Sequence, residues 1–376
     1  MHPAYESQSA TSISSLGAIL KGSTSVYHCD TCAHIQTTEL DNLTDYYDKN
    51  YMLLVESEDQ DQIYCIRDGE KVFRYDHQVD SLLKLVDIPL GAHVLDYGCA
   101  KASTLKKLAQ RRSDITPYVF DVSDTYVSFW GKFVDVENWA THAVNNAWEG
   151  TMDLVTSFFS LEHVASPKQM LTTIRDLLKA DGLFYCIVPD VMQNVADFIV
   201  VDHVNHFTRS SVSRLFADCG FRVHDINTEE HTSAMIVIAQ KSTECEVAGD
   251  ISLTDDERSA VSAKVVEMSG FWAALASRIR TFESALQAPA QAAIYGSGFY
   301  GTYIASCLTD LESIKFFLDR DPYRHGKSLF GKTIIDPELM PDSIDTVLVG
   351  LNPANARQNI EMITSWRARE IQFFYL

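Results

Sequence analysis

Three histidines and one acid supply side chains that could move a proton. Asp202, His203 and His206 fall within five residues, and His163 follows an apolar run that is typical of a buried strand. A histidine exchanges a proton near neutral pH, and an adjacent carboxylate can orient its ring. A single histidine is also a common structural residue, but several that converge on one cleft form an acid–base site. We therefore predict His203, His163, Asp202 and His206 as catalytic residues.

A glycine turn after a predicted strand offers a second kind of chemistry, the binding of a nucleoside. Asp96 and Gly98 close one apolar segment, and Asp121 ends the next. The carboxyl ends of adjacent parallel strands flank one crevice, where the Asp121 carboxylate could accept both hydroxyl groups of a ribose. Gly98 would let the backbone approach this ligand, although Ala100 and Ala102 stand where glycine is common. The alternative is an ordinary strand-to-helix turn.

A second glycine turn has the fuller pattern. Gly296, Gly298 and Gly301 follow an apolar segment, and Asp319 comes eighteen positions later, which matches the dinucleotide-binding fingerprint. This pattern alone predicts an NAD-dependent oxidoreductase module, and a domain that only senses or scaffolds is another hypothesis. No obvious catalytic Lys–Tyr pair or cysteine accompanies the turn, which weakens the oxidoreductase hypothesis.

Two cysteines could bind a metal ion. Cys29 and Cys32 are separated by two residues and supply half of a tetrahedral zinc site. The remaining ligands could come from His2, His28, His34 or Cys65. The alternative is a pair of free thiols. The other cysteines are scattered, which favours reduced thiols and a cytoplasmic protein.

The elements that must position these groups follow from alternating apolar runs and amphipathic stretches. Strands are expected at residues 93–97, 117–121, 153–158, 183–188 and 234–240, with an amphipathic helix at 167–179. Thr254 and Glu257 form a capping box that predicts a helix to about residue 287, with a break near Gly270. A second series is expected as strands at 292–296, 314–318, 345–349 and 372–376, and helices at 299–309 and 355–368.

This alternation predicts an α/β protein with mostly parallel sheets covered by helices. We expect a small N-terminal domain at 1–76, a sheet domain at 77–245, a linking helix at 246–289 and a smaller C-terminal α/β domain at 290–376.

The charge and composition exclude several classes of partner. The net charge is −20 and no basic run is longer than a pair, which argues against nucleic acid and against an anionic membrane surface. The uncharged stretch at 284–309 contains Pro, Gln and Gly, so it is a poor membrane span. No signal-peptide pattern opens the sequence. We expect a cytoplasmic monomer or homodimer with a small-molecule substrate.

The motifs around the first glycine turn resemble the class I S-adenosylmethionine-dependent methyltransferases. The resemblance covers about residues 93–240 and rests on LDYGC at 95–99, the acid at 121, EHV at 162–164 and LLKADGLFYCIVP at 177–189. It implies a Rossmann-like sheet and S-adenosylmethionine as the cofactor. It also implies that Asp96, Gly98, Cys99 and Ala100 hold the methionine end. By the same resemblance Asp121 binds the ribose, Val122 lies by the adenine, and Ser157 and Phe158 line the sulfonium side.

The layout of the whole chain resembles the sugar C-methyltransferases, which act on nucleotide-linked keto-deoxysugars. Their C-terminal signature appears as IYGSGFYG at 294–301, LDRDP at 318–322 and GK at 326–327. The resemblance implies His203 as the catalytic base, with Asp202 as its acidic neighbour. It assigns substrate binding to Tyr295, Gly296, Gly298 and Asp319, and structural zinc to cysteines such as Cys29 and Cys32. This chain departs from the family at Val200, at Val201 and around His231-Thr-Ser-Ala234.

Methyl transfer to carbon needs a carbanion equivalent. A neighbouring ketone makes the C–H acidic enough for a base such as His203, and His206, His163 or Asn205 could stabilise the enolate. An O-methyltransferase would need only a base beside a hydroxyl group, so the same residues could serve that reaction.

Overall fold

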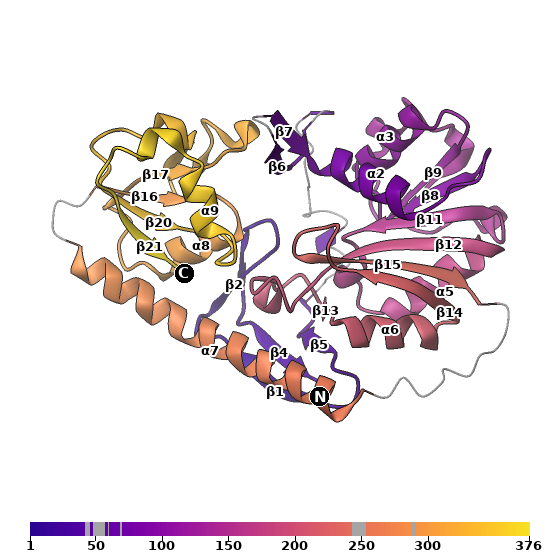
Figure 1. Cartoon of the computed structure of the whole chain (residues 1–376), viewed down its shortest axis with the longest axis horizontal. Helices are drawn as coiled ribbons and strands as arrows, with labels where there is room; N and C mark the ends of the chain where they lie inside the picture. The colour runs from indigo at the N-terminus through magenta and orange to yellow at the C-terminus, as the bar shows by residue number, and fades with distance from the viewer. Residues whose placement is uncertain (42–45, 48–56, 59, 68–69, 243–252, 287–290) are drawn as a thin grey trace. The chain divides into compact units, whose positions relative to one another are not determined.

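The computed structural model describes residues 1–41, 46–47, 57–58, 60–67, 70–242, 253–286 and 291–376 (Figure 1). Two compact units are formed: the first by Met1, His28–Asn194 and Asp202–Ser259, and the second by His2–Tyr27, Val195–Val201 and Ala260–Leu376. The segment predicted as an N-terminal domain, 1–76, is therefore shared between the units. The predicted boundaries at residues 245 and 289 lie outside the described residues.

The first unit is built on a seven-stranded sheet of order β10-β9-β8-β11-β12-β15-β14 (Figure 1). Its strands are β8 (His93–Tyr97), β9 (Thr116–Asp121), β10 (Trp139–Thr141), β11 (Met152–Phe158), β12 (Leu178–Pro189), β14 (Phe221–Asn227) and β15 (Ala234–Lys241). The first five strands in this order run parallel, and β15 is antiparallel to both β12 and β14. This sheet of mostly parallel strands, with β15 antiparallel, agrees with the predicted Rossmann-like sheet.

Helices cover both faces of this sheet because its strands are apolar on both sides. In β8, Val94 packs with α2 and α3, whereas Leu95 packs with α5 and α6. The helices of this unit are α2 (Arg74–Leu85), α3 (Ser103–Arg111), α4 (Val127–Trp130), α5 (Pro167–Leu177) and α6 (Arg209–Asp218). The edge strand β14 was not predicted, because its alternate residues Arg222 and His224 are exposed and interrupt the apolar run.

Two short strand pairs complete the first unit. β6 (Ile63–Arg67) and β7 (Glu70–Phe73) form an antiparallel hairpin just before α2. β5 (Ile35–Thr37) pairs with β13 (Asn205–His206), so the predicted histidine segment is held in an extended conformation.

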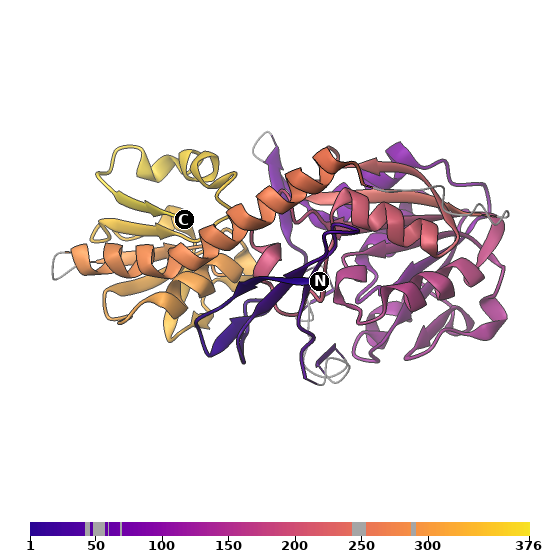
Figure 2. The same ribbon diagram turned by 90° about the horizontal axis from the view of Figure 1, so that it is seen from below.

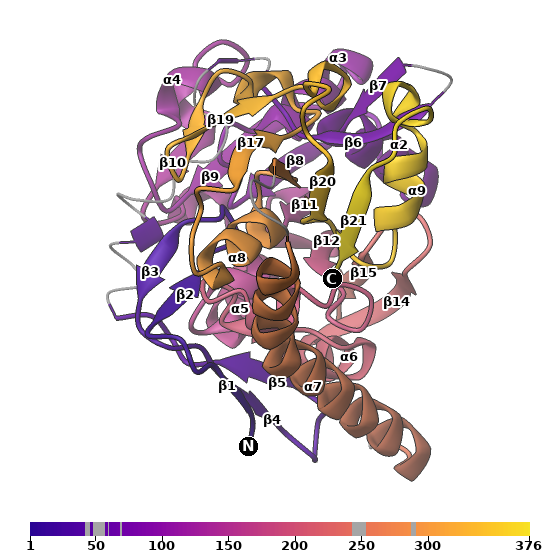
Figure 3. The same cartoon turned by 90° about the vertical axis from the view of Figure 1, so that its left-hand side faces the viewer.

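The second unit contains a six-stranded sheet of order β18-β19-β17-β16-β20-β21. Its strands are β16 (Ala292–Tyr295), β17 (Ile314–Leu318), β18 (Ser328–Leu329), β19 (Lys332–Ile335), β20 (Thr346–Val349) and β21 (Gln372–Tyr375). Strands β17, β19, β20 and β21 of this sheet are labelled in Figure 3. Every pair is parallel except β18 with β19. The unit also contains α8 (Phe299–Cys307), α9 (Ala356–Glu361) and the short strands β1 (His2–Glu6), β2 (Thr11–Ile13), β3 (Ile19–Lys21) and β4 (Ser25–His28).

A long helix, α7 (Asp255–Ala285), precedes this sheet in the sequence (Figure 2). Its predicted capping box is confirmed. The backbone N–H of Glu257 donates to Thr254 Oγ1 at 3.2 Å, and the N–H of Thr254 donates to the Glu257 carboxylate at 2.9 Å. The predicted break near Gly270 is wrong. Gly270 lies on the exposed face, and the buried residues recur every three or four positions on the opposite face without interruption. No helix of the described chain has the length and apolar character needed to cross a membrane.

The glycines of the turn after β16 have different packing roles. A Cβ on Gly301 would lie 1.8 Å from the carbonyl oxygen of Gly296, and one on Gly296 would lie 2.2 Å from the carbonyl oxygen of Gly350. A Cβ on Gly298 would meet nothing within 4 Å. The first and third glycines are therefore required by the close approach of backbone to backbone.

Gly301→Ala should thus lower the free energy of unfolding by roughly 1–3 kcal/mol, because the new methyl group overpacks the turn. Gly298→Ala should change it by less than about 1 kcal/mol, as expected for an alanine at a helix N-cap. Urea denaturation of both variants would measure these changes. Equal losses in the two variants would contradict this account of the turn.

Candidate functional site

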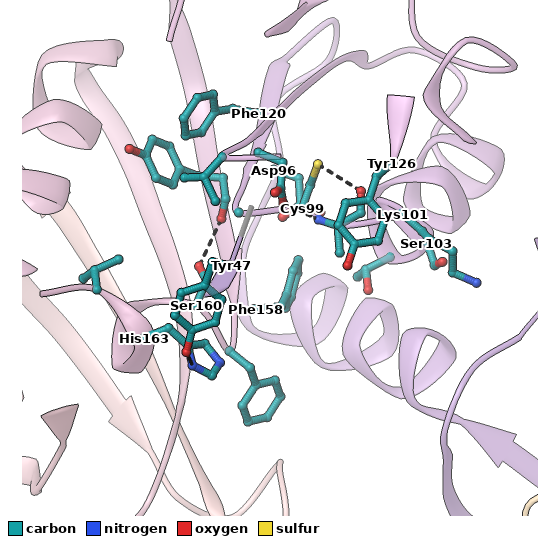
Figure 4. Close-up of a pocket in the computed structure, with 18 of the residues that line it drawn as sticks. Tyr47, Asp96, Cys99, Lys101, Ser103, Phe120, Tyr126, Phe158, Ser160 and His163 are labelled. Carbon is teal, nitrogen blue, oxygen red and sulfur yellow. Dashed lines mark hydrogen bonds between the residues drawn. The ribbon is translucent and has the colours of Figure 1, made fainter. Parts of the chain in front are cut away.

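One pocket opens where β8, β9 and β11 end (Figure 4). These parallel neighbours finish at Tyr97, Asp121 and Phe158, so the loops that follow them meet at one edge of the sheet. The cavity holds about 390 Å³, within the range of roughly 300–1,000 Å³ that is usual for small-molecule sites. Of the residues predicted to bind the cofactor, those that line it are Asp96, Gly98, Cys99, Ala100, Asp121, Val122 and Phe158.

The turn after β8 brings backbone close to the cavity. Gly98 has a φ of +73°, and a Cβ added to it would lie 2.5 Å from Ser160 Oγ. The two alanines that stand in place of glycines, Ala100 and Ala102, also have positive φ values of 46° and 56°. This conformation costs an L-residue about 1–2 kcal/mol. The turn therefore keeps the shape of a glycine-rich loop at some cost in stability.

Asp121 joins the ends of β9 and β8. Its Oδ2 accepts the backbone N–H of Ala100 at 2.8 Å, and its Oδ1 accepts that of Ser123 at 3.1 Å. Burial raises the pKa of Asp121, although the N–H donors oppose this effect. The remaining lone pairs of the carboxylate can accept ribose hydroxyl groups. The neighbouring Val122 is about half exposed, at 48%, where it could contact a base.

Asp96 is a second buried carboxyl group in the pocket. Burial raises its pKa to about 7, the hydroxyl of Thr156 opposes the rise by donating to Oδ1 at 3.1 Å, and the charge of Asp121 adds to it. Two acids this deeply buried in one pocket are costly to the fold, which favours a binding role for them over a packing role.

The loop after β11 differs from its prediction. Phe158 lines the pocket, but Ser157 is fully buried, and its Oγ lies 2.8 Å from Ser160 Oγ. Ser160 and Phe159 line the cavity instead (Figure 4). Their position directly after a predicted strand end was the only sequence signal for them. Phe159 has a φ of +55°, a strained value for a bulky residue.

The predicted catalytic histidines divide into two groups. His163 lines the pocket, and the ring of His203 packs on it nearly perpendicular, with centroids 4.7 Å apart. His206 is buried elsewhere in β13, where its Nε2 lies 2.5 Å from the Thr37 hydroxyl. Neither His203 nor His206 is among the described lining residues. Asn205 also holds local structure, since its amide donates to the Val164 carbonyl at 2.7 Å.

Tyr47 is a site residue that the sequence did not single out (Figure 4). Its hydroxyl lies 2.5 Å from Nδ1 of His163 and donates to the Asp202 carbonyl at 2.6 Å. The same Nδ1 lies 3.0 Å from that carbonyl. Because a carbonyl only accepts, Nδ1 carries the proton and Nε2 of His163 carries the basic lone pair. The sequence signal for Tyr47 was a tyrosine-rich stretch, most of which lies outside the described residues.

The predicted substrate residues belong to the second unit. Tyr295 is 3% exposed and packs against Trp366 in the core of the sheet. The carboxylate of Asp319 accepts the N–H of Ser297 at 2.9 Å and its hydroxyl at 2.5 Å, and its other oxygen accepts the N–H of Asp321. Asp319 therefore closes the glycine turn. Ser297 donates two hydrogen bonds to one oxygen of Asp319 and so fills both lone pairs of that oxygen, which weakens the assignment of Asp319 as the ribose-binding acid of a dinucleotide site.

The predicted zinc site is not supported. Cys29 and Cys32 form no disulfide bond. Within the described part of the chain, the group of three potential ligands close enough to share a metal ion is Glu162, His163 and His203, whose ligand atoms lie within 4.8 Å of one another. The cysteine pair belongs to no such group among these residues.

The raised pKa of Asp96 predicts a pH-dependent cost. The folded protein keeps this proton up to a pH of about 7, whereas the unfolded chain releases it near pH 4. The free energy of unfolding should therefore decrease as the pH rises from about 4 to about 7. Asp96→Asn should remove this dependence and raise the free energy of unfolding by roughly 2–4 kcal/mol above pH 7.

Asp153→Asn is the matched control. At Asp153 burial is outweighed by Lys179 and the N–H of His93, which lower the pKa, so its loss should destabilise the fold at neutral pH. Urea titrations of the three proteins from pH 4 to 8 would measure both effects. A wild-type-like pH profile for Asp96→Asn would contradict the assignment.

The comparisons with known proteins agree with this geometry. Residues 71–226 match a family model described as a methyltransferase domain. The chain is 27% identical over 184 residues to the C-methyltransferase NovU of Streptomyces niveus, which covers 46% of this chain and 44% of that protein. It thus spans less than half the length of this curated relative.

Solved structures of other methyltransferases are also similar. One is a Haloferax volcanii methyltransferase in complex with the Trm112 activator, at 18% identity and a TM-score of 0.39, which covers 46% of this chain and 91% of that one. Another is an S-adenosylmethionine-dependent methyltransferase of Mesorhizobium loti, at 12% identity and a TM-score of 0.37, which covers 44% and 97%. The predicted enzyme class, a methyltransferase, agrees with the match of residues 71–226 to the methyltransferase-domain model.

Proposed function

We propose that this protein transfers a methyl group from S-adenosylmethionine to a carbon atom of a small molecule, with a nucleotide-linked keto sugar as the acceptor class. The observation that carries the proposal is the position of His163. A histidine whose Nε2 can take a proton lines the same pocket as Asp96, Gly98 and Asp121. The partial similarity to a C-methyltransferase supports carbon as the acceptor atom.

The pocket fits the cofactor. Asp121 would hold the ribose and Val122 the adenine, while Asp96 and the turn from Gly98 to Ala100 would hold the methionine end. The cradle at Gly98, which a Cβ would fill, brings backbone to the ligand. When bound there, S-adenosylmethionine supplies an electrophilic methyl group on a sulfonium centre.

The residues of the chain would generate the nucleophile. A ketone beside the reacting carbon makes its C–H acidic, and a histidine positioned there can accept the proton. The sequence resemblance assigns this step to His203, and the pocket lining adds His163. We propose that the two histidines act as one acid–base pair, held by Tyr47 and the main chain of Asp202.

The glycine turn of the second unit is proposed to bind the nucleotide. Gly298 opens α8 and faces open space, so a phosphate could approach the N–H groups of the first turn. Gly296 shapes this turn, Asp319 closes it, and the buried Tyr295 supports it from the core. An O-methyltransferase and a fused NAD-dependent oxidoreductase module are the alternatives.

Ligand binding should separate these classes. S-adenosylhomocysteine should raise the melting temperature of the protein, and NAD should not, because Asp319 is engaged within its own turn. Thermal denaturation with each ligand, and with a panel of nucleoside diphosphates, would measure the shifts. Stabilisation by NAD without stabilisation by S-adenosylhomocysteine would overturn the proposal.

Substitution of the histidines should test the acid–base pair. His163→Ala and His203→Ala should each keep S-adenosylhomocysteine binding and lose about 10²-fold or more in turnover, the usual contribution of a general base. His224→Ala, at an exposed histidine outside the pocket, is the matched control. Normal turnover in both pocket variants would exclude the pair.

Proton exchange should separate carbon from oxygen methylation. Deuterium from the solvent should enter the acidic C–H of the acceptor in the presence of the wild-type protein, and this exchange should be lost in the two histidine variants. An active protein without exchange would favour the O-methyltransferase alternative.

A further inference from the structure

The pocket contains a cation whose role is not assigned by the fold. The charged side chains that line the cavity, histidines apart, are Glu39, Asp61, Arg74, Asp96, Lys101 and Asp121. The ammonium group of Lys101 donates to the backbone carbonyl oxygens of Ser57, Glu58 and Gln60 at 2.7–3.2 Å. Its three protons are thereby directed at the main chain. Arg74 is therefore the cation that this lining can offer to a negatively charged ligand group.

The guanidinium of Arg74 lies over an aromatic ring. Its Cζ lies 5.6 Å from the ring centroid of Phe159, and among the described residues it makes no hydrogen bond or ion pair. Burial raises the pKa of Asp61 and the nearby charge of Arg74 opposes this rise, but the Asp61 carboxylate accepts the backbone N–H of Tyr75 at 2.8 Å. A guanidinium that has no bidentate partner can donate two parallel hydrogen bonds to a carboxylate or a phosphate that enters the pocket.

The platform under Arg74 is fixed by its surroundings. The N–H of Phe159 donates to the Ile187 carbonyl at 2.8 Å, and the ring meets His231 edge-on at 5.3 Å. Burial, with smaller contributions from the charges of His77 and Arg74, lowers the pKa of His231 to about 4 against the opposing Thr232 carbonyl. His231 is therefore neutral at pH 7 and can pack behind the ring without repelling Arg74.

The start of α2 and a neighbouring side-chain amide also favour a negatively charged ligand group. Arg74 is the first residue of α2, and Tyr75 and Gln78 of its first turns also line the cavity, so the positive end of the helix dipole faces this part of the pocket. Gln78 uses its Oε1 to accept the Thr104 hydroxyl at 2.6 Å, which leaves the amide NH₂ group as a donor.

We propose that Arg74 binds the α-carboxylate of the methyl donor. This inference rests on the proposed function, in which S-adenosylmethionine occupies the pocket. That donor carries one carboxylate, at the end opposite the adenosine that Asp121 and Val122 would hold. Arg74 is then the specificity residue for the amino-acid end, and Phe159 and His231 are its positioning residues.

Ligand truncation should test the assignment by binding alone. S-adenosylhomocysteine carries the carboxylate, and 5′-methylthioadenosine lacks the whole amino-acid end. Arg74→Gln should weaken S-adenosylhomocysteine binding ten- to a hundred-fold, the usual range for a charge-assisted bidentate contact, and leave 5′-methylthioadenosine within two-fold of wild type. Arg74→Lys should fall between, because it keeps the charge and loses the fork. Isothermal titration calorimetry of the full chain would measure all three.

Arg67→Gln is the matched control, since Arg67 is an exposed arginine in β6 that does not line the pocket. It should bind both ligands as the wild type does. Equal losses for both ligands in Arg74→Gln would indicate a structural role and overturn the inference, as would an unchanged affinity for S-adenosylhomocysteine. If Arg74→Gln instead lost binding of a nucleoside diphosphate and kept that of S-adenosylhomocysteine, Arg74 would bind the methyl acceptor and the inference would be wrong. A wild-type protein that does not bind S-adenosylhomocysteine would overturn the proposed function itself.

Discussion

The parallel pairing of β8 with β9 and β11 is the constraint on which the site depends. It brings three strand ends to one edge of the sheet, so that the residues after them share a cavity although they are far apart in the sequence. The hydrogen bond from the Ala100 N–H to Asp121 then fixes the turn after β8 against the end of β9. The left-handed conformations of Gly98 and Ala100 are maintained by this same junction.

Several features around the pocket destabilise the fold, and a bound ligand could offset their cost. Two buried carboxyl groups with raised pKa values, together with Ala100 and Phe159 in left-handed conformations, line one cavity. Each of these features lowers the stability of the fold by itself. Their concentration at the ends of parallel strands distinguishes this edge of the sheet from its two apolar faces.

The sequence predicted the central strands well because they are buried on both faces. The expected strands at 93–97 and 153–158 agree with β8 and β11 within a residue. It failed for the half-exposed β14 and for the helix break at Gly270, where local composition conflicts with tertiary packing. The number of glycines in each turn was misleading too. The turn after β8, with fewer glycines, lines a pocket, whereas the turn after β16, with three, is closed by Asp319 and by backbone contacts.

The sequence by itself determined the α/β class, the glycine turn after β8 and the presence of histidines suited to proton transfer, because these depend on local periodicity and residue type. Only the tertiary structure decided which side chains meet. It placed His163 in the pocket and His206 in β13, and it brought Tyr47 and Arg74, which the sequence had not singled out, to the same cavity. The reason is physical: a side chain's partners are set by strand order and register, which join residues more than a hundred positions apart.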